Sequence, residues 1–422
     1  MTAMTHASPA FFDLVVIGAG PAGSAAAIHG VAAGYQVLLV ESGALGRDKT
    51  CGDGLTPRAI SELRKLGLAD VVTERYTNRG LKLHGYGGSV TAPWPESAYG
   101  TVGSAMPRTL FDEHLARTAQ QRGADVRALS TAHAPVVTRG RITELTVQPA
   151  DGEAYTVRPK WVIVADGVRS PVGKELGRRW HREEVYGIAA RSYVSSPFHA
   201  EPWMHSHVEL RGEDGAIQPG YGWIFPLGDG TVNLGCGALS TNARPAKVNT
   251  KKLLDHYADL CRPDWQLGMP ERVTSALLPM GGAVSQVAGG NWMLIGDAAA
   301  GVNPLNGEGI DYGLEMAEWA IDMLATDAAA ELRRAWPELL RERYGEAFLL
   351  ARTAARLLTY PQFLPTVGPL ALRGPIGARL MPAAARLMAN LITDDDRDLL
   401  ARMWRAAGHC ASAVRRDTPL WS

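Results

Sequence analysis

Cysteine is scarce in this chain of 422 residues, which has four, far apart in the sequence. Cys51, Cys236, Cys261 and Cys410 form no CxxC pair, so the pattern excludes a disulfide framework and a clustered-thiolate zinc site. His205 and His207 lie two residues apart but have no companion ligands, so we expect no metal site. Free thiols indicate a reducing compartment, and we expect the protein to be cytoplasmic.

Long apolar runs and a net charge are also missing. No stretch reaches the ~18 to 20 apolar residues of a membrane span, and the first ten residues, MTAMTHASPA, do not resemble a secretion signal. The 43 basic and 43 acidic side chains cancel, so no overall field favours nucleic acid. We therefore expect no nucleic-acid partner, and any membrane contact should be peripheral.

Residues 13–42 have the pattern of a strand, a glycine-rich turn, a small-residue helix and a second strand. In GAGPAG, Gly18 permits the tight turn, Gly20 lets backbone N–H groups approach a pyrophosphate, and Gly23 allows close helix packing. Glu41 ends the second strand, where it can accept hydrogen bonds from ribose hydroxyls and disfavours a 2′-phosphate. The pattern predicts FAD or NAD rather than NADP. The expected cofactor contacts are Gly18, Ala19, Gly20, Pro21, Ala22, Gly23, Glu41 and Ser42.

Two further strand-to-turn junctions follow downstream. KWVIVADG ends at Asp166 and Gly167, and NWMLIGD ends at Gly296 and Asp297 before a helix predicted from residue 310 to 325. Asp297 can hold a ribitol hydroxyl, and the N–H groups at the following helix start can face a flavin. Each Asp taken alone would be interpreted as a helix N-cap.

Together, GAGPAG with Glu41, the ADG at 165–167 and the GDAA at 296–299 resemble the hydroxybenzoate-hydroxylase-type flavoproteins over residues 13–325. The resemblance implies bound FAD and an α/β, Rossmann-like fold. It also implies that Arg108, in MPRTLFDEHL, lies near the flavin phosphates and ribityl chain.

Three segments narrow the resemblance: CGDGLTPRA (51–59), GYGWIFPLGDGTVNLG (220–235) and GDAAAGVNPLNGEGID (296–311). They are similar to the geranylgeranyl reductase family, and most similar to its menaquinone-chain reductase members in actinobacteria. Archaeal lipid reductases usually show three glycines where this chain has Gly307-Glu308-Gly309, which favours the quinone-type members. The resemblance implies that Cys51, Gly52, Gly307, Gly309 and Ile310 lie beside the flavin.

That family saturates isoprenoid double bonds, and the chemistry indicates which residues are needed. Hydride addition to an alkene with no adjacent carbonyl would leave an unstabilised carbanion. Protonation of the alkene therefore has to precede hydride transfer or accompany it. Cys51 is the candidate proton source, because a thiol with a pKa near ~8.5 is protonated at neutral pH; an inert packing role is the alternative. Tyr221 and Trp223, continued by Phe225, would share one strand face as an aromatic wall, or would pack in a core. We expect Asp53 and Arg58 to close and cap the helix PRAISELRKLG.

The chain is predicted to have a discontinuous FAD-binding domain, an antiparallel β-sheet substrate domain and a helical C-terminal region. Their expected ranges are 1–74, 106–178 and 276–325 for the first, 75–105 and 179–275 for the second, and 326–422 for the third. No second glycine-rich βαβ unit follows, so NAD(P)H or another electron donor would bind transiently.

Residues 347–393 combine five arginines and no acid with many apolar residues. Such a segment either lies on an anionic membrane surface or packs on the core with arginine outside. The sequence predicts an FAD-dependent reductase of a long isoprenoid lipid, menaquinone first. An aromatic monooxygenase and a non-catalytic flavin or lipid carrier are the alternatives.

Overall fold

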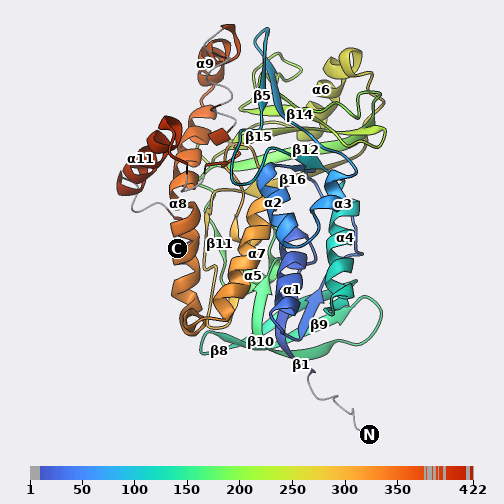
Figure 1. The fold of residues 1–422 in the computed structure, drawn as a ribbon, viewed down its shortest axis with the longest axis vertical. Coiled ribbons are helices and arrows are strands. Elements are labelled where there is room, and N and C mark those ends of the chain that lie inside the picture. Colours follow the sequence, from blue (N-terminus) through green and yellow to red (C-terminus); the bar gives the residue numbers. More distant parts are fainter. Residues whose placement is uncertain are drawn as a thin grey trace.

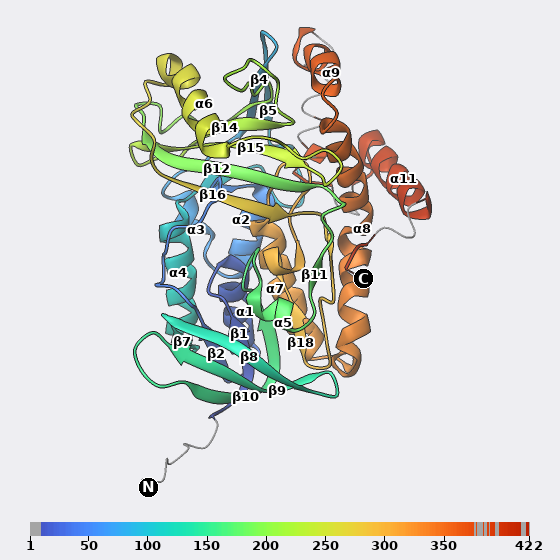
Figure 2. The ribbon, with the colours of Figure 1, turned by 180° about the vertical axis from the view of Figure 1, so that it is seen from behind.

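The structure is a computed structural model. It describes residues 10–374, 377, 383, 386–387, 389–392, 396–414 and 419–421. Two sheets lie one above the other, with helices packed around the lower sheet and a helical arm along one side (Figures 1 and 2). The α/β class is confirmed.

The lower sheet has a parallel centre that is buried on both faces, as its continuous apolar strands require. Two antiparallel strands, β9 and β8, extend it beyond β10. Its strands are β7 (Asp125–Arg127), β2 (Val37–Val40), β1 (Ala10–Ile17), β10 (Tyr155–Val164), β18 (Trp292–Leu294), β9 (Arg141–Pro149) and β8 (Ser130–Thr138).

Helices cover the lower sheet and pack against one another. The βαβ unit and the helix after residue 310 are both confirmed, the latter with the expected apolar face buried. The packed helices are α1 (Pro21–Ala32), α4 (Arg108–Gln121), α7 (Ile310–Leu324) and α8 (Leu332–Leu358).

The upper sheet also has seven strands, and its outer face is covered by α6 (Thr250–Trp265), as Figure 2 shows. All its pairings are antiparallel except that of β13 with β4, which corrects the purely antiparallel expectation. The strands in order are β16 (Glu271–Pro279), β12 (Tyr186–Ser195), β15 (Thr231–Ser240), β14 (Gly220–Pro226), β13 (Met204–His207), β4 (Gly80–Gly85) and β5 (Gly88–Pro93). The boundary expected at residue 275 falls inside β16.

The remaining elements outside the C-terminal arm are short. They are β3 (Gly54–Leu55) paired with β6 (Ser104–Ala105), β11 (Arg179–Trp180) paired with β17 (Val284–Ser285), α2 (Pro57–Lys65), α3 (Ala69–Thr73), α5 (Pro171–Glu175), η1 (Gly296–Ala299) and η2 (Asp327–Glu331). The expected helix PRAISELRKLG is α2.

The C-terminal arm is helical, as expected, where the structure describes it. It continues from α8 into α9 (Phe363–Leu372) and includes α11 (Leu399–Val414), which packs against α8. Residues 375–376, 378–382, 384–385, 388 and 393 of the arginine-rich segment lie outside the described residues. Arg352 does not border a surface, because it is fully buried and donates to the Pro419 carbonyl at 2.9 Å.

Trp421 attaches the last described residues to η1, the turn that follows β18. Its Nε1 donates to the Ala299 carbonyl at 2.7 Å, and its ring fills the space beside Gly282. Trp421 is therefore packed into the core.

Candidate active site

The turn between β1 and α1 has the backbone geometry of a phosphate cradle. Gly18 has a φ of +100°, and a Cβ on Gly23 would lie 1.8 Å from the Gly18 carbonyl oxygen. α1 begins at Pro21 with no side-chain cap from the described residues. Its first N–H groups are therefore available to an anion.

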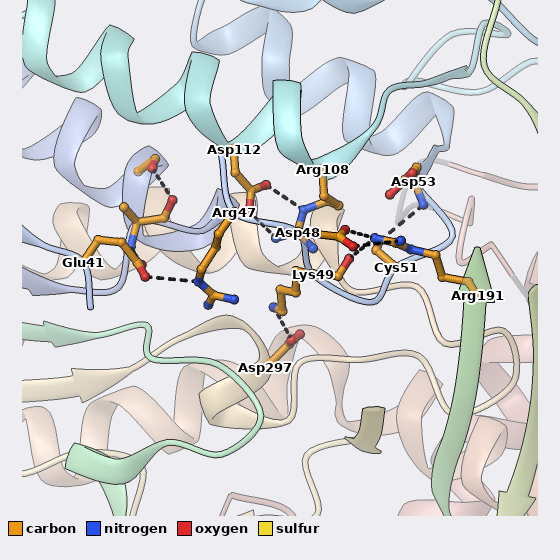
Figure 3. Close-up of polar contacts among 12 residues, drawn as sticks. Glu41, Arg47, Asp48, Lys49, Cys51, Asp53, Arg108, Asp112, Arg191 and Asp297 are labelled. Carbon is orange, nitrogen blue, oxygen red and sulfur yellow. Dashed lines mark hydrogen bonds and ion pairs between the residues drawn. The ribbon is translucent and has the colours of Figure 1, made fainter. Parts of the chain in front are cut away.

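Glu41 ties the end of β2 to this turn (Figure 3). Its Oε2 accepts from the Ala19 N–H at 2.8 Å, and its Oε1 accepts from the Gly43 N–H at 2.9 Å. Arg47 Nε lies 3.3 Å from Oε1, and the Ser42 hydroxyl is 3.4 Å from it. The carboxylate retains lone pairs for hydroxyl donors.

Arg108 lies above the glycine-rich turn. Its Nε and Nη2 donate to the two carboxylate oxygens of Asp112 at 2.6 and 2.5 Å, and the pair is buried. Nη2 is 3.8 Å from the position of a Cβ on Gly20. The Arg108 guanidinium therefore lies beside the turn, and Asp112 of the same helix, α4, holds it in place.

The two downstream aspartates have different surroundings. Asp166 points to the start of α5, where its Oδ2 accepts from the Val172 N–H at 2.9 Å, so its side chain makes a helix-start contact. Its neighbours Ala165 and Gly167 line the cavity. Asp297 lines the cavity itself and pairs with Lys49 at 3.0 Å (Figure 3).

Lys49 changes the ionisation of Asp297. Burial opposes the charged form, but Lys49, together with Arg108 and Arg178, outweighs burial, so the pKa of Asp297 is lowered. The carboxylate therefore stays ionised and able to accept hydroxyl donors. Lys49 precedes the Cys51 turn and was not singled out from the sequence.

Cys51 lies in a turn that is hydrogen-bonded to the upper sheet. The Asp53 N–H donates to Cys51 Sγ at 3.3 Å. Asn233 Nδ2 donates to both the Cys51 carbonyl and Asp53 Oδ2, each at 2.8 Å, while Trp223 Nε1 donates to Asn233 Oδ1 at 2.8 Å. Asn233 thereby connects the turn to the aromatic strand, and the sequence analysis missed it.

Asp53 and Arg58 do not cap α2, contrary to expectation. The cap is Thr56, whose side chain accepts from the Ala59 N–H at 3.5 Å. Arg58 is buried and pairs with Glu315 of α7 at 2.6 and 2.9 Å. Asp53 is buried beside Asn233, so both residues join distant elements instead of closing their own helix.

Burial controls the titration of this turn. It raises the pKa of the Cys51 thiol, although the positive charge of Arg108 opposes the shift. It also raises the pKa of Asp53 to about 6, against the stabilising effect of Tyr193, Asn233 and nearby arginines. The Cys51 side chain is therefore a thiol at neutral pH.

The predicted aromatic face exists. Tyr221, Trp223 and Phe225 all line the cavity, with ring centroids 5.8 Å apart for the first pair and 6.2 Å for the second. A Cβ on Gly235, opposite Trp223 on β15, would lie 2.0 Å from the indole. The glycine therefore makes room for Trp223 to lie along the strand.

One cavity of about 420 Å³ connects these parts. It begins at the glycine-rich turn and the Lys49–Asp297 pair, passes between the Cys51 turn and the aromatic wall, and ends against α9. Gly307, Gly309 and Ile310 also line it, as does Gly52. At the α9 end its walls are apolar, with Phe363, Leu364, Val367 and Ala371.

His205 and His207 lie away from this cavity. His205 Nδ1 is 3.0 Å from His84 Nε2, and His207 Nδ1 is 2.5 Å from the Tyr257 hydroxyl under α6. In the described part of the chain, no group of three or more His, Cys, Asp or Glu side chains could hold a metal ion.

The polar end of the cavity fits a dinucleotide. The close approach at Gly18 and Gly23, the uncapped start of α1 and the cation at Arg108 suit a pyrophosphate. Asp297 lines the cavity with a carboxylate that can accept from hydroxyl groups, whereas Glu41 accepts from the Ala19 N–H and does not itself line the cavity. A sequence-family profile described as "FAD binding domain" matches residues 12–352. The chain belongs to the FAD-binding domain family.

This FAD-binding protein has similar curated relatives over nearly its full length. It is 52% identical over 96% of its chain to "Menaquinone reductase" of Mycobacterium tuberculosis, covering 98% of that protein. It is 49% identical over 96% of its chain to "Menaquinone reductase" of Mycolicibacterium smegmatis, again covering 98%. A "Digeranylgeranylglycerophospholipid reductase 1" of Methanopyrus kandleri is 29% identical over 82% of this chain and 90% of its own. The resemblance to the geranylgeranyl reductase family and the FAD cofactor are confirmed.

Solved structures confirm the fold of the FAD-binding protein. A geranylgeranyl bacteriochlorophyll reductase-like protein from Thermoplasma acidophilum matches with a TM-score of 0.76 at 21% identity, over 95% of this chain and 100% of its own. The flavin-dependent brominase Bmp2 matches with a TM-score of 0.69 at 18% identity, over 96% and 100%. At these identities the likeness concerns the fold alone.

Proposed function

We propose that this chain is an FAD-dependent reductase that saturates carbon–carbon double bonds in the isoprenoid tail of menaquinone. Its relatives are named reductases of menaquinone and of a digeranylgeranyl phospholipid. These two kinds of lipid share an isoprenoid tail, which makes the tail the common target. The observation that carries the proposal is the apolar cavity that runs from the cofactor turns to α9.

The chemistry requires an acid and a hydride at the same double bond. Bound FAD in its reduced form would supply the hydride. The Cys51 thiol is the acid in this proposal, because it lines the cavity and burial keeps it protonated. Protonation of the less substituted alkene carbon leaves positive charge on the tertiary carbon, which the hydride then quenches.

The wall opposite the Cys51 turn suits developing positive charge. Tyr221 and Trp223 present aromatic surface to the cavity, which attracts a cation without providing a nucleophile. Asn233 positions the turn against Trp223, because its side-chain amide oxygen accepts from Trp223 Nε1 and its amide nitrogen donates to the Cys51 carbonyl. The apolar lining beyond these residues excludes the water that would trap the cation.

A first experiment tests the reaction class. The purified protein with FAD is incubated anaerobically with menaquinone and dithionite, and the products are analysed by tandem mass spectrometry. We expect a pair of hydrogen atoms to be added to the tail. Oxygen consumption with NAD(P)H and an oxygenated product would indicate the monooxygenase alternative, and an unchanged lipid would indicate a carrier.

Replacement of Cys51 tests the acid. Cys51→Ala should keep the flavin spectrum but lower the rate of alkene reduction by about 100-fold, the usual contribution of a general acid. Cys51→Ser is the matched control for size, and it should be nearly as slow. Full activity in Cys51→Ala would assign the thiol to packing.

We also propose that the C-terminal arm contacts the membrane that holds the substrate. Val367 lines the cavity yet is 41% exposed, and Leu370, one turn along on α9, is 64% exposed. Arg356 and Arg373 are exposed nearby, where they could meet anionic lipid. None of the helices among the described residues is long and apolar enough to cross a bilayer.

Vesicle sedimentation tests the membrane contact. Wild-type protein should sediment with anionic vesicles, and Leu370→Asp should bind them about tenfold less well, because burial of a leucine is worth ~1.5 kcal/mol or more. Leu260→Asp, at an exposed leucine on α6 far from the arm, is the control. Equal sedimentation of Leu370→Asp and wild type would contradict the contact.

NAD(P)H is the proposed transient electron donor. Its role can be tested by the bleaching of the flavin absorbance when NAD(P)H is added under anaerobic conditions.

A further inference from the structure

The carboxyl group of Glu308 lines the cavity, and the reaction proposed above assigns no role to it. It lies between Gly307 and Gly309, ahead of α7. Its Oε2 is 3.4 Å from Asn306 Nδ2, whereas its Oε1 is buried and has no hydrogen-bond partner among the described residues. Because a buried, unpartnered carboxylate oxygen is costly, this environment favours the neutral acid.

Asp311 stands behind Glu308 on the first turn of α7. It is fully buried, and neither of its carboxylate oxygens has a hydrogen-bond partner in the described ranges. Two such carboxyls near each other resist being ionised together. Burial and the neighbouring acid raise the pKa of Asp311 well above its ordinary range, and burial raises the pKa of Glu308 to about 7.

Other groups near the pair do not remove this effect. A hydrogen bond with Thr56 and the positive charge of Arg58, which is paired with Glu315, favour the carboxylate of Glu308 but do not outweigh its burial. The charged and titratable groups that face Glu308 come from α2, α7 and β14, and they are Arg58, Asp311, Tyr312, Glu315 and Tyr221. The pair of acids therefore retains a proton at neutral pH.

Cys51 needs such a proton once it has reacted. A thiolate formed inside the cavity is buried, and its conjugate thiol has a raised pKa. Tyr221 interacts electrostatically with both Cys51 and Glu308, so one phenol lies within range of the two groups. The Tyr221 hydroxyl is itself held by the Asn306 carbonyl at 2.5 Å, beside Glu308.

We propose that Glu308, backed by Asp311, is the proton reservoir that restores the Cys51 thiol after each reduction; this inference rests on the proposed function. In the transfer, the O–H bond of Glu308 breaks and the S–H bond of Cys51 forms. The resulting carboxylate then regains a proton from water. The direction is favourable because a buried thiol holds its proton more tightly than Glu308 does.

A comparison of single-turnover and repeated-turnover rates distinguishes the reservoir role of Glu308 from the acid role of Cys51. With flavin reduced beforehand, Glu308→Gln should complete one reduction within about twofold of the wild-type rate, because Cys51 begins protonated. Its repeated-turnover rate should fall about 100-fold. Glu318→Gln, at a partly exposed acid on α7, should change neither rate. Circular dichroism and the flavin spectrum check that each variant is folded.

The pH dependence gives a second test with a defined sign. Because the protonated acid is required, the wild-type repeated-turnover rate should fall as pH rises through about 7. Glu308→Gln should lose this fall. Asp311 stays protonated while Glu308 titrates, so Asp311→Asn removes no charge and should leave the fall near pH 7 in place.

Infrared spectroscopy tests the reservoir without any turnover. Wild-type protein without substrate should show a protonated-carboxyl band that titrates near pH 7 and is missing in Glu308→Gln. A wild type that leaves the tail unreduced while keeping this band would overturn the proposed function, and the reservoir with it. An active wild type matched by Glu308→Gln in repeated turnover, or a Glu308 band absent at pH 6, would overturn the reservoir alone.

Discussion

The two ends of the cavity are built in opposite ways. At the cofactor end, backbone N–H groups and paired charges such as Lys49–Asp297 and Arg108–Asp112 surround the space. At the α9 end the lining is aromatic and aliphatic. The difference shows how one fold can hold an anionic cofactor and a neutral lipid end to end: fixed charge lies at one end, and apolar side chains line the other.

The largest expected effect comes from breaking the buried ion pair between Arg58 and Glu315, which joins α2 to α7 outside the cavity lining. Arg58 follows the Cys51 turn and Glu315 follows the glycine loop before α7, and their side chains are each 6% exposed. Glu315→Gln leaves the guanidinium buried without its countercharge, so we expect the free energy of unfolding to fall by about 3 to 5 kcal/mol. Denaturant unfolding measures this loss.

A double replacement sharpens that test. Arg58→Met combined with Glu315→Leu should recover most of the loss, because two apolar side chains need no countercharge. Arg117→Met breaks the exposed pair with Glu113 on α4 and should cost under about 1 kcal/mol. A loss in Glu315→Gln no larger than that in Arg117→Met would show that the Arg58–Glu315 pair does not stabilise the fold.

The next effect is confined to the cofactor end. Gly23→Val forces a side chain toward the Gly18 carbonyl, which must shift the turn. Overpacking costs about 1 to 3 kcal/mol, so FAD affinity should fall about 10- to 100-fold. Titration of the flavin-free protein with FAD measures the affinity. Ala32→Val, at an exposed site on the same helix, is the control, and equal affinities would contradict the cradle.

The smallest effect is confined to the lipid end. Gly235→Val displaces the Trp223 indole from its place along β15. We expect FAD to bind normally while the rate of tail reduction falls about tenfold, as loss of a single cation–π surface implies. Thr231→Val, on the same strand outside the cavity, is the control. If Gly235→Val lost as much FAD affinity as Gly23→Val does, the two ends of the cavity would not be separate binding regions for cofactor and lipid.

The sequence allowed much of the cofactor end to be predicted because that end depends on backbone geometry. Glycines at 18, 20 and 23 with an acid at 41 constrain neighbouring residues, and these constraints are local. The strands and helices of the lower sheet follow from continuous apolar runs and helical spacing. The fold, its family and the FAD cofactor were therefore accessible before any coordinates.

The rest of the site depends on contacts between residues far apart in the chain. Asn233 reaches Cys51 across 182 positions, and Lys49 reaches Asp297 across 248. No local pattern marks such pairs, so Asp53 and Arg58 were expected to cap a helix that Thr56 caps. Glu308 was noted only as a departure from a glycine run, and its unpartnered oxygen became visible only in the packed cavity.

A crystal structure of the FAD-loaded protein with bound menaquinone tests the central claim most directly. The account predicts that the isoprenoid tail lies in the cavity between Cys51 and Trp223, with a double bond against the flavin and α9 over the remaining tail. A quinone ring seated at the flavin, with the tail outside the cavity, would contradict it.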